Sequence, residues 1–165
     1  MSADELFDRA NNSADELFDR ANKEWDAGKR RQAFRLFSQA AAQGHASAQN
    51  SLGYFYDHGI AVAKDSDKAM FWYRKAARRG DVCAYGNLAI TYRDAGNFSR
   101  AKFWFAKALA GRDDDAAVEL AKLCLRGRRP NVAQARKYLK VAVRSKYIFP
   151  EKKEEARKLL KKLSP

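Results

Sequence analysis

The sequence is poor in the residues that most enzymes use for catalysis. Its 165 residues include only two histidines and two cysteines. Cys83 and Cys124 have neither a metal-ligand spacing nor a CxxC spacing, so we interpret them as reduced thiols within helices. The sequence also lacks a glycine-rich phosphate loop, an HExxH pair and a nucleophile elbow. We therefore predict a non-catalytic protein with no metal site and no cofactor.

Long apolar runs are absent as well, and proline occurs only three times. No stretch approaches the ~20 consecutive apolar residues that a membrane helix needs. The first residues, MSADELFDRA, lack the basic start and apolar core of a secretory signal. These absences predict a cytoplasmic location without a transmembrane segment.

Apolar residues instead recur at helical spacing. Residues 48–80, AQNSLGYFYDHGIAVAKDSDKAMFWYRKAARRG, predict two helices with small residues at their crossing and aromatic residues around it. The pattern recurs along the chain, because four second-helix alanines are 36, 32 and 34 residues apart: Ala33, Ala69, Ala101 and Ala135. Helices are expected to end at Gly28, Gly44, Gly59, Gly80, Gly96, Gly111 and Gly127. A period in the mid-thirties predicts an all-α solenoid of about four antiparallel hairpins.

The central hairpin resembles a Sel-1-like repeat of the tetratricopeptide superfamily. The matching residues are Ala48, Leu52, Gly53, Tyr56, Gly59, Val62, Asp65, Lys68, Ala69, Trp72, Tyr73, Lys75, Ala76, Ala77 and Gly80. The sequence departs from the family at Ala61, where a second loop glycine is usual. Residues 84–111 are similar to the shorter tetratricopeptide unit, and the resemblance covers about residues 14 to 145. The resemblance is specific for the fold and says little about function, because the matched residues are packing residues.

Two terminal segments flank the predicted repeats. Residues 2–11, SADELFDRAN, recur without change at 13–22, which indicates a recent tandem duplication or an artefact. Residues 1–12 then either extend the first helix or form a separate or artefactual copy. Each copy opens with a capping box, which allows a helix to start after Ser2 or after Ser13. We assign residues 13–148 to the repeat domain. Residues 149–165 then form a basic amphipathic helix that caps the last repeat with Ala156, Leu159, Leu160 and Leu163.

The charge is unevenly distributed along the chain. The formal net charge is +13. Residues 1–60 contain 7 basic and 9 acidic residues, a net charge of −2, whereas residues 61–165 contain 26 and 11, a net charge of +15. This asymmetry predicts a partner with an acidic surface where it meets the C-terminal half.

The resemblance also implies which side chains face the concave groove lined by the first helix of each hairpin. The partner-binding positions that we carry over are Trp25, Asn50, Tyr54, His58, Ile90, Arg93, Lys122 and Arg126, with Phe18, Asn22, Asp26, Asp57, Asp94, Val118 and Leu125 beside them. The lysine that a chaperone-tail clamp needs beside Asn50 is missing, so we reject that interpretation.

Two other patterns have simple structural explanations. The aromatic runs Phe71-Trp72-Tyr73 and Phe103-Trp104-Phe105 resemble stacking boxes, but their helical spacing favours packing between helices. Residues 113–115, Asp-Asp-Asp, resemble a metal site, but they directly precede a helix, where carboxylates interact favourably with the helix dipole.

The sequence therefore predicts a protein-binding module that holds a protein or peptide in its groove. Small bacterial members of the family resemble adaptors or toxin-neutralising immunity proteins, and both roles stay open. The alternative is binding of nucleic acid or of an acidic membrane surface through the basic half, although a base-stacking platform is missing if the aromatic residues pack. We expect a monomer or a weak homodimer.

Overall fold

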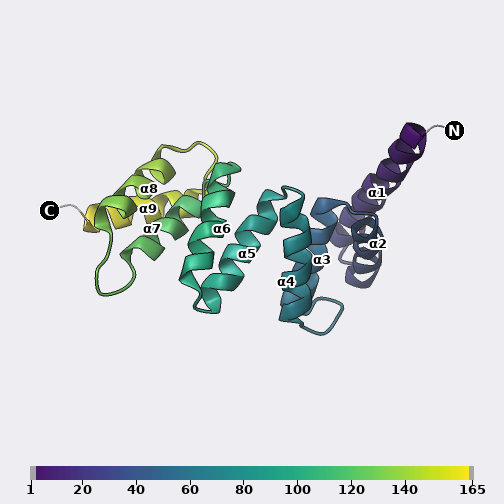
Figure 1. The fold of residues 1–165 in the computed structure, drawn as a ribbon, viewed down its shortest axis with the longest axis horizontal. Helices are drawn as coiled ribbons and strands as arrows, with labels where there is room; N and C mark the ends of the chain where they lie inside the picture. Colours follow the sequence, from purple (N-terminus) through teal and green to yellow (C-terminus); the bar gives the residue numbers. More distant parts are fainter. Residues whose placement is uncertain (1–2, 164–165) are drawn as a thin grey trace. The chain divides into compact units, whose positions relative to one another are not determined.

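The computed structural model describes the backbone of residues 3–163 and the side chains of residues 13–163. Within this part of the chain it contains nine α-helices and no strand. The chain divides into two compact units, Met1–Ala84 (unit 1) and Tyr85–Pro165 (unit 2). Each unit is built from helix hairpins (Figure 1). The predicted all-α repeat fold is confirmed, whereas the predicted domain boundaries stay predictions.

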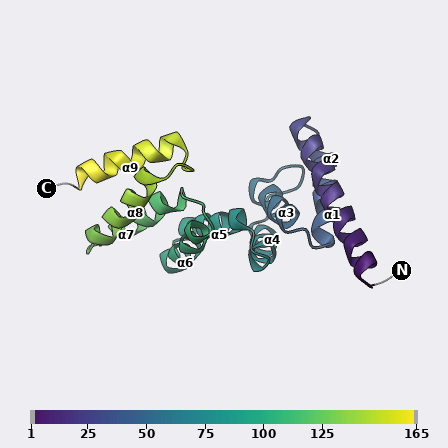
Figure 2. The same cartoon turned by 90° about the horizontal axis from the view of Figure 1, so that it is seen from above.

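Unit 1 contains two hairpins. The first pairs α1 (Ala3–Asp26) with α2 (Arg30–Ala42), and the second pairs α3 (Ala46–His58) with α4 (Ser66–Arg78). Figure 2 shows α1 and α2 side by side. His45 caps the start of α3, since its Nδ1 accepts the backbone N–H of Ala48 at 3.1 Å. The carboxylate of Asp65 caps α4 by accepting the N–H of Lys68 at 2.9 Å, as the sequence predicts.

Small residues allow α3 and α4 to approach each other closely. A Cβ atom on Gly53 would lie 2.6 Å from Cδ1 of Tyr73 and 3.2 Å from the carbonyl oxygen of Ala69. The ring of Tyr73 is fully buried in this space, and Ala69 and Ala76 beside it are buried as well. The prediction that the two helices cross at small residues, with aromatic rings around the crossing, is therefore confirmed.

Unit 2 contains most of α5 (Val82–Asp94), which pairs with α6 (Phe98–Ala110), followed by the hairpin of α7 (Ala116–Leu125) and α8 (Val132–Arg144). Side-chain oxygens of Asn97 and Asn131 cap α6 and α8 by accepting the N–H groups of Arg100 and Gln134. The predicted packing residues of these hairpins are buried: Leu88, Ala89, Ala101, Phe105, Ala108, Ala135, Leu139 and Ala142.

The last helix, α9 (Pro150–Lys162), covers the end of unit 2. It lies beside α7 and α8 in both views (Figures 1 and 2). Its Ala156 is fully buried in the cluster that α7 and α8 form, and Leu159, Leu160 and Leu163 pack against that cluster. The predicted apolar stripe thus faces the last hairpin, which is the position that a solenoid cap requires.

Two turns place a residue other than glycine in the left-handed region. The helix α6 ends at Gly111, as the sequence predicts, but the φ of Gly111 is −81° and the next residue, Arg112, has φ 75°. In the loop after α3, Ala61 has φ 61°, at the position where the resemblance expects glycine. An L-residue in the left-handed conformation is disfavoured by about 1–2 kcal/mol, so both turns are strained.

The N-terminal copy joins the first repeat without a break. The helix α1 runs continuously from Ala3 to Asp26, which agrees with the expected alternative of one uninterrupted helix. The side chains of residues 3–12 lie outside the described part, as does Ser2. Whether this first copy contributes to the core therefore stays a prediction.

The structure corrects the packing prediction for two aromatic residues. Phe71 on α4 is 50% exposed and Phe103 on α6 is 54% exposed, whereas Tyr73 and Phe105 are buried. Three consecutive residues of a helix point in directions about 100° apart, so one of them has to face away from the core. Each exposed ring lies beside a lysine four residues later, with Lys75 4.9 Å from the Phe71 ring centroid and Lys107 5.4 Å from that of Phe103.

No helix between residues 3 and 163 is both long and apolar enough to cross a bilayer.

Candidate functional site

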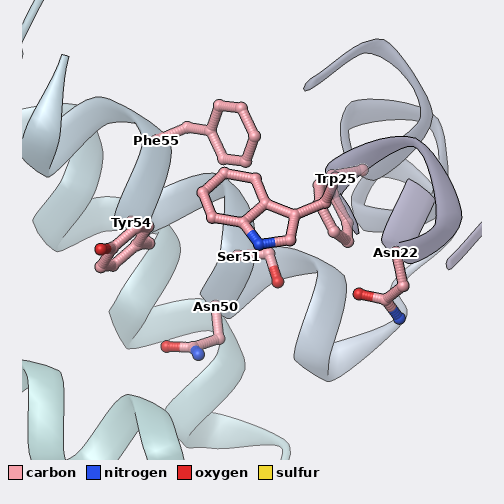
Figure 3. Close-up of a pocket in the computed structure, with 7 residues that line it drawn as sticks. Asn22, Trp25, Asn50, Ser51, Tyr54 and Phe55 are labelled. Carbon is pink, nitrogen blue, oxygen red and sulfur yellow. The ribbon is translucent and has the colours of Figure 1, made fainter. Parts of the chain in front are cut away.

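The first helices of the two hairpins in unit 1 enclose an open cavity of about 180 Å³. Its walls come from α1 and α3, with one ring from α2: Asn22, Trp25, Phe37, Asn50, Ser51, Tyr54 and Phe55. We call it the aromatic pocket (Figure 3). Sites for small-molecule ligands and cofactors usually measure about 300–1,000 Å³, so this pocket fits one large side chain better than a cofactor.

Trp25 is the central wall of the aromatic pocket and is held on several sides. It lies in the last turn of α1, half-buried, with its ring centroid 5.3 Å from that of Phe55 and 6.3 Å from that of Tyr54 in edge-on geometry. The guanidinium of Arg30 lies 3.7 Å from the Trp25 ring centroid. Arg30 also donates a hydrogen bond to the carbonyl oxygen of Trp25. These contacts fix the indole in a defined orientation, so this side of the aromatic pocket is preorganised for a ligand.

The polar groups of the aromatic pocket come from helical positions next to the aromatic ones. Asn22 is three residues before Trp25, and Asn50 is four residues before Tyr54, so each pair shares one face of its helix. In the view of Figure 3, both amides lie on the same side of the indole. A carboxamide both donates and accepts hydrogen bonds, which is the capacity needed to bind the backbone of an extended peptide.

Two further groove predictions in unit 1 contribute differently. His58 lies outside the lining and stacks on Tyr54, with ring centroids 4.0 Å apart. Asp57 faces the core, since its carboxylate accepts the hydroxyl of Tyr73 at 3.5 Å. Burial and the neighbouring Asp57 charge both raise the pKa of Tyr73 far above its ordinary value, so the phenol stays neutral.

Unit 2 brings together another part of the predicted groove. Arg93 from α5, Lys122 from α7 and Arg126 at the end of α7 line a cavity of about 290 Å³ together with Phe98, Glu119 and Leu123. We call it the basic cavity. Ile90 is 40% exposed and lies outside the lining. The predicted residues therefore gather in two places, one in each unit.

One groove prediction is wrong. Val118 is fully buried rather than exposed in a groove. It packs in the same cluster as Ile148 and Ala156, which belong to α9 and the loop before it. The physical reason is that α9 and the loop before it cover this side of α7.

Sequence reasoning missed the central residue of the basic cavity, Glu119. It is 8% exposed and accepts the side-chain N–H groups of Arg93, Lys122 and Lys152 at 3.0, 3.1 and 2.6 Å. Burial alone would raise the pKa of Glu119, but the hydrogen bonds and charges of Lys152 and Lys122 outweigh burial and hold its pKa below the ordinary value. The signal in the sequence is its place on a helix, AAVELAKLCL, whose other charged residue is Lys122 and whose remaining residues are apolar.

The aspartates before α7 hold the loop that leads to α9. Asp114 accepts a hydrogen bond from the hydroxyl of Ser145, and Asp115 accepts the N–H of Phe149 at 3.2 Å. Burial, followed by the charge of Asp115, raises the pKa of Asp113. The loop anchors itself with the buried Ile148 while Tyr147 and Phe149 remain 73% and 67% exposed. The carboxylates thus have a structural role that the predicted helix-start interpretation covers only in part.

Comparison with protein families gives one match across most of the chain. Residues 27–45, 46–81, 85–113 and 114–147 match the Sel1 repeat. A stretch of 65 residues is 40% identical to the chitin synthase regulator SKT5 of Saccharomyces cerevisiae, which corresponds to 39% of this chain and 9% of that protein. The chain therefore spans less than a tenth of this curated relative.

Two solved structures are similar to this fold. A Sel1 repeat protein from Oxalobacter formigenes is 24% identical with a TM-score of 0.76, over 98% of this chain and 66% of the other. A protective antigen of uropathogenic Escherichia coli strains, which displays an SLR fold, is 31% identical with a TM-score of 0.61, over 67% of this chain and 25% of the other. The last three matched segments correspond to the hairpins α3/α4, α5/α6 and α7/α8, whereas the first, residues 27–45, contains α2 alone. Together the four segments cover well over half of the sequence. The chain therefore belongs to the Sel1 repeat family.

Proposed function

We propose that this chain is a non-catalytic protein-binding module that holds a segment of its partner in the aromatic pocket of unit 1. Sel1 repeat proteins are generally protein-interaction modules, which supports the class of function. The observation that carries the proposal is the pairing of Asn22 and Asn50, from two successive hairpins, around the wall formed by Trp25 and Tyr54.

The proposed binding mode follows from the chemistry of the pocket. One apolar side chain of the partner enters the cavity and packs on Trp25, Tyr54 and Phe55, where aromatic rings supply most of the contact area. The carboxamides of Asn22 and Asn50 bind the neighbouring backbone N–H and C=O groups. An adaptor role and an immunity role both use this contact, and the identity of the partner separates them.

A selection experiment tests the proposal. A library of random twelve-residue peptides is displayed on phage and selected against the full chain, and the affinities of synthesised binders are then measured by fluorescence polarisation. We expect a shared apolar anchor residue and a loss of at least about tenfold in affinity, ~1.4 kcal/mol, for Tyr54→Ala or Asn50→Ala.

Phe71→Ala is the matched control, because it removes an exposed ring of unit 1 that lies outside the aromatic pocket. It should change affinity by less than about twofold, a difference of ~0.4 kcal/mol. The proposal is wrong if Phe71→Ala weakens the selected peptides as much as Tyr54→Ala does, or if the selection yields no binder.

Nucleic-acid binding by unit 2 is the second candidate, and one observation favours it. The sequence suggested that no aromatic ring is available for stacking, but Tyr147 and Phe149 are exposed, and the guanidinium of Arg112 lies 5.4 Å from the Tyr147 ring centroid. Residues 85–165 contain 20 basic and 8 acidic residues, a net charge of +12. If this candidate is right, Tyr147→Ala should weaken binding of a single-stranded RNA, because each stacked base contributes about 1–3 kcal/mol.

A further inference from the structure

The basic cavity of unit 2 has the features of a site for a negatively charged group. Its cations come from the end of α5 and from α7, and its apolar side is formed by Phe98 at the start of α6 and by the buried Leu123. The cavity measures about 290 Å³. Its position on the first helices of two hairpins corresponds to the positions from which α1 and α3 build the aromatic pocket.

The buried carboxylate of Glu119 orients two of the cations. Its Oε2 atom accepts Nη1 of Arg93 at 3.0 Å, and its Oε1 atom accepts Nζ of Lys122 at 3.1 Å. Asp94 holds Nε of Arg93 at 2.8 Å, and Glu155 also pairs with Lys122. Long basic side chains normally lose conformational entropy when they bind, and these two are already ordered, so a ligand has little ordering left to impose.

Arg126 differs from its neighbours because it forms no ion pair with any residue between 13 and 163. Its guanidinium lies 4.0 Å from the ring centroid of Phe98. Stacking on a ring engages the face of the guanidinium and leaves the N–H groups on its edge available. Those edge donors match the two oxygens of a carboxylate in a bidentate pair.

The charge around the cavity remains positive after all internal pairs are counted. Four cations, Arg93, Lys122, Arg126 and Lys152, face three carboxylates, Asp94, Glu119 and Glu155. One singly charged anion therefore balances the site. A phosphate monoester with two negative charges would exceed that balance. The phosphodiester of a nucleic acid carries one charge, as a carboxylate does, so the experiment below has to separate these two anions.

We propose that the basic cavity binds an Asp or Glu side chain of an acidic partner protein, with Arg126 as its bidentate ligand and Lys122 as a second donor. An apolar neighbour of that acidic residue packs on Phe98 and Leu123. Glu119 acts as a positioning residue for Arg93 and Lys122. The inference rests on the proposed function in that the partner is a protein, but the site is separate from the aromatic pocket.

Arg126 also has a simpler explanation. A cation at the C-terminus of α7 interacts favourably with the helix dipole and with the Phe98 ring, and neither contact needs a ligand. The two explanations differ in one measurable respect. A purely structural arginine affects the unfolding of the chain, whereas a ligand-binding arginine affects peptide affinity in a protein that remains folded.

The experiment titrates the ¹⁵N-labelled full chain with the blocked peptide acetyl-Glu-Glu-Leu-Glu-Glu-amide and follows amide chemical shifts by NMR. We expect shifts at residues 93–98 and 119–127, and none with the matched peptide in which glutamine replaces glutamate. Arg126→Gln should raise the dissociation constant at least about fivefold, or ~1 kcal/mol. Arg126→Lys keeps the charge and the fold but loses bidentate geometry, so its dissociation constant should lie between those of the wild type and of Arg126→Gln.

Arg129→Gln is the matched control, because it removes the same charge from an exposed position of the neighbouring loop. It should raise the dissociation constant by less than about twofold, ~0.4 kcal/mol. Equal losses for Arg126→Gln and Arg129→Gln would show diffuse attraction and overturn the inference. It would also be overturned if the glutamate peptide caused no shifts, or if a decauridylate bound more tightly at the same amides.

A third variant separates this inference from the proposed function. Tyr54→Ala alters the aromatic pocket in unit 1 only, so the glutamate peptide should bind this variant as it binds the wild type. If Tyr54→Ala weakened the glutamate peptide as much as Arg126→Gln did, the peptide would be using the aromatic pocket and the basic cavity would lose its assignment. If only the library peptides of the previous section failed, the basic cavity would stand without the aromatic pocket.

Discussion

Replacing Gly53 by alanine tests the packing of the central hairpin with a single methyl group. The added Cβ would lie 2.6 Å from Cδ1 and 2.7 Å from Cε1 of Tyr73, and 3.2 Å from the carbonyl oxygen of Ala69. Carbon atoms in contact prefer separations of about 3.5–4.0 Å. The fully buried ring of Tyr73 would therefore have to retreat by about 1 Å, or α3 and α4 would have to separate.

Two effects of opposite sign determine the result. Alanine favours the helix over glycine by about 1 kcal/mol. Overpacking a tight core costs about 1–3 kcal/mol and occasionally more. The clash here involves two ring carbons and a backbone atom, none of them the end of a flexible chain. We therefore expect Gly53→Ala to lower the free energy of unfolding by about 1–2 kcal/mol, since the upper part of the overpacking range applies.

A compensating background makes the test sharper. The equivalent residues in the α7/α8 hairpin are Ala121 and Leu139, which are both fully buried in one cluster, so a methyl group is tolerated in that hairpin, where a leucine replaces the ring. In a Tyr73→Leu background, adding Gly53→Ala should raise stability by up to ~1 kcal/mol, because helix propensity then acts alone. Urea unfolding followed by far-UV circular dichroism measures all four proteins. The reasoning is refuted if Gly53→Ala stabilises the wild type.

Five further changes have defined expected outcomes. Ala61→Gly should raise stability by up to ~1 kcal/mol in urea unfolding, because relief of left-handed strain exceeds the entropy that glycine adds to the unfolded chain; Arg112→Gly should gain less, since it also loses the contact with the Tyr147 ring. The stability contributed by Glu119 should be present above pH 4.5 and lost as the pH falls through its lowered folded-state pKa. Glu119→Gln should therefore destabilise by about 1–3 kcal/mol at pH 7, and this difference should shrink in urea titrations at pH 3. Burial raises the pKa of Asp113, so the ionised carboxylate lowers the stability of the folded state. In thermal melts, Asp113→Asn should therefore have a higher melting temperature than the wild type at pH 7, and this difference should disappear below pH 3.8. Deleting residues 2–12 should change the free energy of unfolding by less than about 0.5 kcal/mol, and a loss of several kcal/mol would show that the first copy packs on the core.

The packing of the hairpins could be predicted from sequence because the same steric problem recurs in every repeat. Two helices can cross closely only where their side chains are small, and the alanines at 36-, 32- and 34-residue spacing mark that crossing in each hairpin. All four, Ala33, Ala69, Ala101 and Ala135, are at most 1% exposed. The α9 cap was predictable for a related reason, since an exposed apolar edge of the last hairpin has to be covered.

The end of α6 at Gly111 could be predicted, but the left-handed residue of the following turn could not. Gly111 is the residue that a left-handed conformation prefers, yet its φ is −81° and Arg112 adopts φ 75°. The position of the left-handed residue depends on where Asp113 and the following carboxylates meet α5 and the α8–α9 loop. Such tertiary contacts do not appear in a local pattern of residue types.

The candidate sites were predicted in part for the same reason. Trp25, Asn50 and Tyr54 gather in one pocket because their positions on the helices are fixed by the packed leucines and alanines beside them. Glu119 was missed because its burial depends on Lys152 from α9, which is distant in sequence. Val118 was misplaced because the same cap covers it. For both Glu119 and Val118, the local repeat pattern predicts the helix correctly, but α9 buries the side chain.

The repeat separates residues that hold the fold from residues that set its surface chemistry. The position directly after the packed Leu-Gly or Leu-Ala pair is Tyr54 in α3, Ile90 in α5 and Lys122 in α7. All three side chains are at least partly exposed, so they can differ without disturbing the crossing below them. This freedom allows one framework to carry an aromatic pocket in unit 1 and an ionic cavity in unit 2. Exchanging the residues at positions 54 and 90 should therefore change which peptides bind while the melting temperature stays within a few degrees, about the shift expected for 1 kcal/mol or less.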